Sequence, residues 1–420
     1  MSFKSVQATP MNAAVVPLRS RAGSRHRYGV LYFSLGGSAF TVSINAKSRN
    51  RNQLVWPVTG IVVTILAVKF AATNPFYTPH IALQTGIAAW FAALVLVIVL
   101  SAYRIGARVG VVMAGLFLAI PCFVTSPPLF RGLLMCIMCM PFSAAAALVL
   151  APPIATVRAR LAYLCSWCGT HQVSRRARSL DVASLLHLIV ATAVLAIGMT
   201  AVIAVPDANF WLLLRWLAGG IMILAFAEMV TACFPLVATA FGVIVPPLMQ
   251  SPYLSTSVGE FWTKRWNILA SEKVFGPYCF APLARRSVGL ALFAGFALSA
   301  VGHALMVFIA LGSWKISLIW GTFFLVQPLL IIAERWLAVR RWRPASARVW
   351  TLAALAITSP LFVEPMLRIV EESWGTQDSA LPPTAVVLGF VFVFSCVVSL
   401  ASLASYSAAI QYSPPNALDR

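Results

Sequence analysis

Charged residues are scarce in this chain of 420 residues. Asp, Glu, Lys and Arg make up 10% of it, against 60% hydrophobic residues and a mean hydropathy of +0.87. A soluble core of this length does not require so apolar a composition, so an ordinary soluble fold is excluded. The formal net charge of +20 suggests nucleic acid as a partner. However, the basic residues stand in blocks between apolar runs rather than on one face, which argues against that partner.

A complete set of metal ligands is also missing. Cys165-x-x-Cys168, followed by His171, looks like half of a zinc site, but no second ligand pair stands at a workable spacing. Five of the eight cysteines lie within or beside apolar runs, where a free Cys acts as a small hydrophobe: Cys122, Cys136, Cys139, Cys233 and Cys396. We therefore expect no metal, no cofactor and no disulfide-stapled loops.

Long apolar runs are what the chain does have, and each is close to the roughly 20 residues that cross a hydrocarbon core of about 30 Å. Ten such segments predict an all-α polytopic membrane protein with about ten transmembrane helices, set in a lipid bilayer. The expected spans are 55–72, 81–103, 109–125, 132–151, 182–205, 210–232, 287–311, 314–336, 346–363 and 384–405. We further expect a short interfacial helix over 238–249, because Pro246 and Pro247 end it before a full span is reached.

The placement of Lys and Arg predicts the topology. When residues at span ends are counted with the adjoining loop, 26 of the 31 fall on the side of the N terminus and three on the other side. This excess favours a cytoplasmic N terminus, in a bacterial inner membrane or the endoplasmic reticulum. Residues 1–54 hold eight Lys and Arg and no acid, which is typical of a mostly disordered arm. The transmembrane domain is then 55–405, followed by a short tail, 406–420.

One polar stretch and one histidine stand out among the apolar runs. Residues 251–267 form a connector rich in polar and aromatic side chains, and the predicted topology places it on the cytoplasmic side. Its Trp, Phe, Lys and Arg are typical of an amphipathic element at headgroup level. The next span, 287–311, contains a single titratable side chain, His303. Because an ionisable group inside a membrane is costly to keep, His303 is the first candidate for a functional residue.

Three motifs follow one another in this region: FWTKRWN at 261–267, FALSAVGH at 296–303, and FFLVQP at 323–328 with Glu334. In this order they resemble the wax synthase branch of the membrane-bound O-acyltransferases, whose members carry an FW-x-x-RWN-type connector, an SG-x-x-H helix and a following helix ending in Glu. The likeness covers residues 245–336, about a fifth of the chain. Two positions depart from it: Ala300 replaces the usual Gly, and Ala304 replaces the acidic residue that often follows the His.

The resemblance implies transfer of an acyl group from acyl-CoA to the hydroxyl of a lipophilic alcohol, without an acyl-enzyme intermediate. In this reaction His303 is the general base, and the Asn267 amide binds the thioester carbonyl or the developing oxyanion. The candidates for substrate binding are Trp262, Arg265, Trp266, Ser299, Gln327 and Glu334. Ser299 and His303 share a helix face because they are four residues apart.

Several of these residues also have an ordinary structural interpretation. The tryptophans and Arg265 are typical of an aromatic belt and of the positive-inside rule, and Arg265 is otherwise a candidate ligand for the phosphates of coenzyme A. Glu334 is placed to form an interfacial ion pair with Arg335. Arg215, within a span, is expected to extend its charged group toward the outer interface.

Two other functions remain open at this point. One is an O-acetyltransferase that acts on a secondary metabolite, which differs only in its donor and acceptor. The other is a membrane transporter, but the chain lacks the two similar halves that many transporters show. The acceptor alcohol, the acyl chain length and the oligomeric state do not follow from the sequence.

Overall fold

The structure is a computed structural model that describes residues 28–34, 39–45, 55–73, 81–103, 106–150, 156–164, 174–175, 179–208, 210–240, 242–244, 248–284 and 286–375. The chain divides into two compact units, Met1–Leu54 and Val55–Arg420. In the first unit, β1 (Tyr28–Ser34) and β2 (Ala39–Asn45) pair as an antiparallel hairpin, with Tyr28 opposite Asn45. This hairpin lies in the arm that the sequence predicts as mostly disordered; its aromatic and β-branched residues are of the kind that favours strands.

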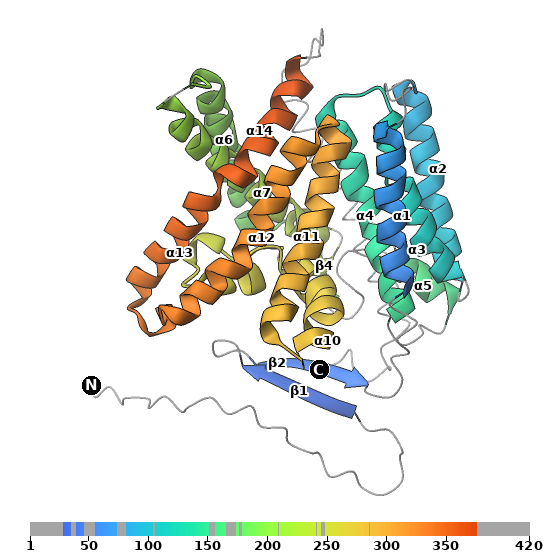
Figure 1. Cartoon of the computed structure of the whole chain (residues 1–420), viewed down its shortest axis with the longest axis horizontal. Helices are drawn as coiled ribbons and strands as arrows, with labels where there is room; N and C mark the ends of the chain where they lie inside the picture. Colours follow the sequence, from blue (N-terminus) through green and yellow to red (C-terminus); the bar gives the residue numbers. More distant parts are fainter. Residues whose placement is uncertain are drawn as a thin grey trace, which may run out of the picture. The chain divides into compact units, whose positions relative to one another are not determined.

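The second unit is built from helices, which Figure 1 labels. The longer ones are α1 (Val55–Thr73), α2 (Leu83–Ala102), α3 (Gly106–Phe117), α4 (Pro128–Leu150), α5 (Val157–Leu164), α6 (Val182–Ala204), α7 (Trp211–Ala240), α11 (Val288–Leu311), α12 (Trp314–Trp336), α13 (Pro344–Thr358) and α14 (Pro360–Gly375). Among the described residues, seven helices are long and apolar enough to cross a membrane, or eight if the bent pair α13 and α14 is one span. The all-α polytopic fold class is therefore confirmed, whereas the count of ten is not.

Most expected spans coincide with helices, and the differences have local causes. The predicted span 109–125 is split into α3 and η2 (Ile120–Phe123), which begins beside Pro121. The ninth, 346–363, is bent by 49° where Pro360 begins α14. The tenth, 384–405, lies outside the described residues.

The expected interfacial helix over 238–249 is wrong. α7 continues to Ala240, eight residues beyond the predicted end of its span, and β4 (Val243–Ile244) follows and pairs with β3 (Ser174–Arg175). The helix passes through Pro235, whose carbonyl accepts a hydrogen bond from the Thr239 hydroxyl at 2.7 Å. The stretch between the end of α7 and the connector is therefore shorter than the predicted spans imply.

The helices of this unit pack in a recognisable succession. α1, α2, α3 and α4 lie side by side, α4 contacts α11, α11 pairs with α12, and α14 contacts both α12 and α7 (Figure 1). The turn between α11 and α12 is tight because Gly312 adopts a left-handed conformation with φ of 69° and Ser313 caps α12. His303 on α11 and Phe324 on α12 are nearly equidistant from this turn, so the antiparallel pair brings them together.

An ion cluster around the buried Arg215 joins α7 to α14. Arg215 is only 3% exposed, whereas its partners Asp207 and Glu371 are 41% and 36% exposed. The Arg215 guanidinium pairs with Asp207 at 3.1 Å and with Glu371. Arg368 also bonds Asp207, at 3.0 Å, and the indole N–H of Trp216 donates to Glu364. These pairs neutralise charges that would otherwise be costly within an apolar helix bundle.

Candidate active site

His303 is held by its own helix in a defined orientation. Its Nδ1 lies 2.8 Å from the backbone carbonyl oxygen of Ser299 and 3.3 Å from the Ser299 hydroxyl. Because a carbonyl oxygen can only accept a hydrogen bond, Nδ1 carries the proton in this arrangement. In a neutral ring the other nitrogen, Nε2, then keeps its lone pair, which is the state a general base requires.

Aromatic side chains surround the imidazole. The ring stacks on Phe324 with centroids 4.1 Å apart and meets the edge of Trp320 at 5.4 Å. Phe324 and Trp320 are buried, and both belong to α12. The site therefore offers apolar walls, in which a hydrogen bond to a substrate is stronger than it would be in water.

Small residues lie next to this ring. A Cβ added at Gly295 or Gly302 would meet nothing within 4 Å, so α11 leaves open space at both positions. Across the helix pair, a Cβ added at Gly321 of α12 would lie 3.6 Å from the Ala300 carbonyl oxygen, an ordinary van der Waals contact.

Trp262 carries the connector into the interface between α11 and α12. It lies in η5 (Phe261–Arg265), a π-helical turn that follows α8 (Val258–Glu260), and its indole N–H donates to Gln327 Oε1 at 3.1 Å. Its ring lies 5.7 Å from Phe296 and 5.9 Å from Phe324, the residue on which His303 stacks. Trp262 and His303 therefore contact the same phenylalanine.

Gln327 is fully buried, and its amide is used within the protein. Oε1 accepts from Trp262, while Nε2 donates to the Phe323 carbonyl at 3.1 Å and to the Thr358 hydroxyl at 3.4 Å. This side chain therefore ties the connector and α13 to α12. Trp266 stacks on Phe261, with centroids 5.4 Å apart, and so stays within the connector.

Glu334 anchors the start of the connector helix. Its carboxylate is 6% exposed and accepts the backbone N–H groups of Val258 at 2.5 Å and of Gly259 at 3.4 Å. The expected ion pair with Arg335 is wrong, since Arg335 is exposed and the carboxylate binds backbone amides instead. A helix N-terminus has unpaired N–H groups and a positive partial charge, which explains why it attracts this carboxylate.

Arg265 is engaged inside the connector. Its Nε donates to Glu260 Oε1 at 2.7 Å, and a terminal nitrogen donates to the carbonyls of Gln250 and Ser251 at 3.1 and 3.4 Å. Burial raises the pKa of Glu260, but hydrogen bonds from the Thr256 N–H and hydroxyl, together with Arg265, outweigh it and hold that pKa below its usual range. The pair therefore holds the two ends of the connector segment 250–265 together.

This clasp is expected to weaken in acid. A carboxyl whose folded pKa is lowered adds stability at neutral pH, and that stability is lost as the pH falls through the folded pKa, below about 4.3 for Glu. Hydrogen exchange of residues 250–266, corrected for intrinsic rates, should show protection that falls in this range. Glu260→Gln should lose about 0.2–1 kcal/mol of local stability at pH 7 and show no acid step, because the pair is partly exposed. An identical acid step in both proteins would contradict the assignment.

Asn267 has a local structural role. It adopts a left-handed conformation with φ of 42° and caps α9 (Ile268–Ala270), because its Oδ1 accepts the Ala270 N–H at 3.3 Å. Asn tolerates this conformation better than most residues. The cap leaves the amide nitrogen without a hydrogen-bond partner among the described residues, so the N–H groups are available as donors. Within the described contacts, no hydrogen bond joins Asn267 to His303.

Two polar groups near these helices were missed from the sequence. His187 on α6 lies 3.2 Å from Glu228 on α7, a pair that consecutive antiparallel helices allow but that hydropathy does not reveal. Trp320 is 2% exposed, and its Nε1 has no hydrogen-bond partner although it lies beside His303. No sequence signal separates this tryptophan from the others.

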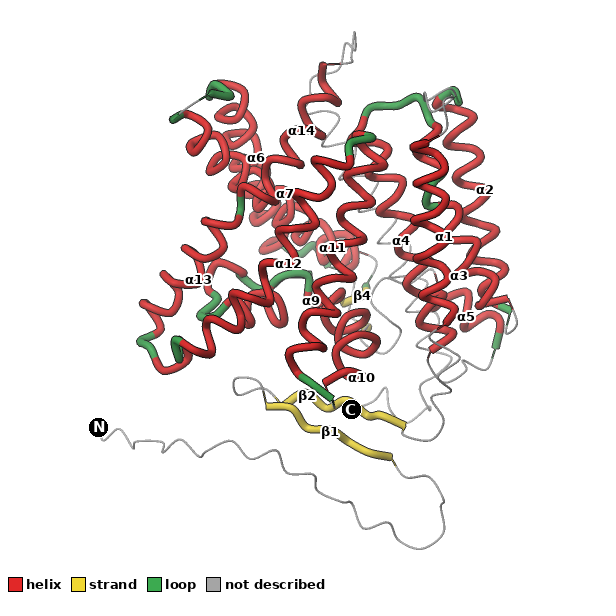
Figure 2. Tube along the Cα trace, in the orientation of Figure 1, coloured by secondary structure: helices red, strands yellow, loops and turns green. Residues whose placement is uncertain are grey.

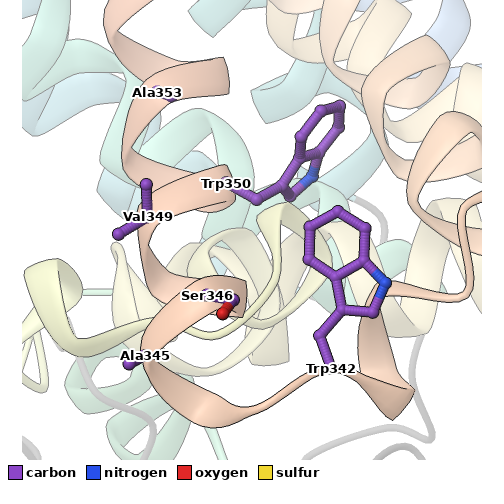
Figure 3. Close-up of a pocket in the computed structure, with 6 residues that line it drawn as sticks. All are labelled: Trp342, Ala345, Ser346, Val349, Trp350 and Ala353. Atoms are coloured by element: carbon purple, nitrogen blue, oxygen red, sulfur yellow. The ribbon is translucent and has the colours of Figure 1, made fainter.

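A pocket of about 530 Å³ lies on α13 and the turn before it (Figure 3). Its lining consists of Trp342, Ala345, Ser346, Val349, Trp350 and Ala353. Figure 2 shows the helices of the second unit in red and the described loops between them in green. Within the described part of the chain, no three potential metal ligands come together, and Cys165, Cys168 and His171 lie outside it.

Comparison with known proteins supports the resemblance seen in the sequence. Residues 245–326 match the membrane bound O-acyl transferase family. Probable long-chain-alcohol O-fatty-acyltransferases 3, 2 and 1 of Arabidopsis thaliana are 28%, 29% and 30% identical over 150, 140 and 151 residues. These alignments cover 32%, 30% and 31% of this chain. The chain spans less than half the length of these relatives, at 43%, 39% and 42%.

Proposed function

We propose that this multi-pass membrane protein transfers an acyl group from acyl-CoA to the hydroxyl of a lipophilic alcohol, a proposal that the match of residues 245–326 to the membrane bound O-acyl transferase family supports. The names of its relatives in Arabidopsis thaliana support a long-chain alcohol as the acceptor and a fatty acyl group as the donor. The observation that carries the proposal is His303, whose Nδ1 is bound by Ser299 so that Nε2 keeps its lone pair.

The reaction needs a base, an oxyanion donor and a proton for the leaving group. His303 Nε2 takes the hydroxyl proton while the alcohol oxygen bonds to the thioester carbon. The carbon–sulfur bond then breaks, and the imidazolium gives this proton to the coenzyme A thiolate. Atoms balance without an acyl-enzyme intermediate, and the products are an ester and free coenzyme A. The aromatic walls around His303 exclude water that would hydrolyse the thioester.

Direct assay tests the proposal. Membranes that contain the protein are given labelled acyl-CoA, from acetyl to long-chain, with a panel of fatty alcohols, sterols and terpenoid alcohols. The expected result is an ester together with an equal amount of free coenzyme A. Long-chain donors should be preferred, whereas a preference for acetyl-CoA would favour the O-acetyltransferase. The proposal fails if no ester is formed and the lipids of an expressing host match those of a host without the protein.

Asn267 is proposed as the donor to the thioester carbonyl. Asn267→Asp is the sharpest test, because Asp can also adopt the left-handed conformation and cap α9 but lacks the amide N–H. If the amide donates to the reacting carbonyl, kcat should fall about 10²- to 10³-fold while the thermal stability stays close to that of the wild type. If Asn267 serves only as a cap, the Asp variant should keep its activity.

A further inference from the structure

The buried indole of Trp320 is in ring contact with His303. Its ring centroid lies 5.4 Å from that of His303, and on another side the ring meets Phe362 at 5.2 Å. The side chain is 2% exposed, yet its Nε1 has no hydrogen-bond partner among the described residues. Buried N–H groups are nearly always paired, because an unpaired donor has lost its bond to water. A donor kept in this state beside a candidate base points to a partner that arrives with the substrate.

No acceptor among the described residues bonds this indole N–H. In the imidazole that it contacts, Nδ1 is bound to the Ser299 carbonyl, and the lone pair of Nε2 is needed for the alcohol proton in the proposed reaction. The half-buried indole of Trp216, by contrast, donates to Glu364 at 2.8 Å. The Trp320 indole makes no such bond among the described residues. An oxygen atom of the substrate would satisfy it.

We propose that the N–H of Trp320 donates to the carbonyl oxygen of the acyl group as that oxygen becomes an oxyanion, an inference that rests on the proposed function. The alcohol oxygen bonds to the thioester carbon, and the carbonyl electron pair moves onto the oxygen that the indole faces. When the carbonyl re-forms, the carbon–sulfur bond breaks, and the thiolate takes the proton from His303. An indole N–H is a donor only, so it does not compete with His303 for the alcohol proton. Held in an apolar site, it stabilises the charge without reorganisation.

Trp320→Phe tests this role, because it removes the N–H and keeps an aromatic ring against His303 and Phe362. The expected result is a fall in kcat of about 10²- to 10³-fold per folded molecule, with the KM for the alcohol and for acyl-CoA nearly unchanged. If the Trp320 indole only packs against its neighbours, kcat per folded molecule should stay unchanged, because removing an unpaired N–H breaks no hydrogen bond. The folded fraction is measured by fluorescence-detected size exclusion, and rates are divided by it.

Trp90→Phe is the matched control. Trp90 lies on α2, is 6% exposed and also has an unpaired Nε1, but it makes no ring contact with His303 in the described part of the chain. Its replacement should leave kcat unchanged. A fall of less than tenfold in Trp320→Phe, with wild type and Trp90→Phe active, overturns this inference alone. Absence of ester from the wild type overturns the proposed function before any variant is compared.

Discussion

His303→Ala is expected to lower kcat for ester formation by about 10²- to 10⁴-fold, the contribution that general base catalysis commonly makes. The reason is geometric: Ser299 binds Nδ1, so Nε2 is the nitrogen with the free lone pair. The measurement is the single-turnover rate of ester formation from labelled acyl-CoA, with the amount of folded protein held equal. Ester synthesis at the wild-type rate would contradict the assignment of His303 as the base.

Two controls separate chemistry from packing in this experiment. His303→Phe keeps an aromatic ring against Phe324, on which the imidazole stacks at 4.1 Å, but it has no basic nitrogen. It should be as inactive as His303→Ala and more stable than it. His187→Ala removes a histidine that pairs with Glu228 on α6 and α7, and it should retain activity. If His303→Ala and His187→Ala lost activity equally, the loss would reflect misfolding and not the removal of a base.

Glu334→Ala is expected to detach the start of the connector from α12. The carboxylate accepts two backbone N–H groups, those of Val258 and Gly259, and its loss leaves both without their acceptor. Each unpaired buried group costs about 1–3 kcal/mol, so the melting temperature in detergent should fall markedly. Because α8 leads directly into Trp262, hydrogen exchange of residues 256–266 should speed up, and activity should fall with it.

Glu334→Gln distinguishes the charge from the hydrogen bond. Its amide oxygen can still accept one N–H, so the variant should lie between the wild type and Glu334→Ala in both stability and exchange. Lys315→Ala, at an exposed position near the start of α12, serves as the control and should change stability by no more than about 0.5 kcal/mol. Unchanged exchange in Glu334→Ala would show that the connector is held by other contacts.

The sequence predicted the helices well because hydropathy is a property of each segment alone. Spans such as 182–205 and 314–336 match α6 and α12 within a residue or two at each end. The prediction from sequence failed at two prolines. α7 continues through Pro235, and Pro360 divides one predicted span into α13 and α14. Proline marks a possible boundary, but packing decides whether the helix ends there.

By itself the sequence determined that this is a membrane protein, which family its segment 245–326 matches, and that one titratable group lies within the span at 303. Only the tertiary structure decided what each polar side chain binds. Glu334 reaches Val258, and Trp262 reaches Gln327, across separations of 76 and 65 residues. Such pairs depend on how α8, η5 and α12 pack, and no local pattern encodes that. The stacking of His303 on Phe324 and the isolation of the Trp320 N–H arise from the same packing.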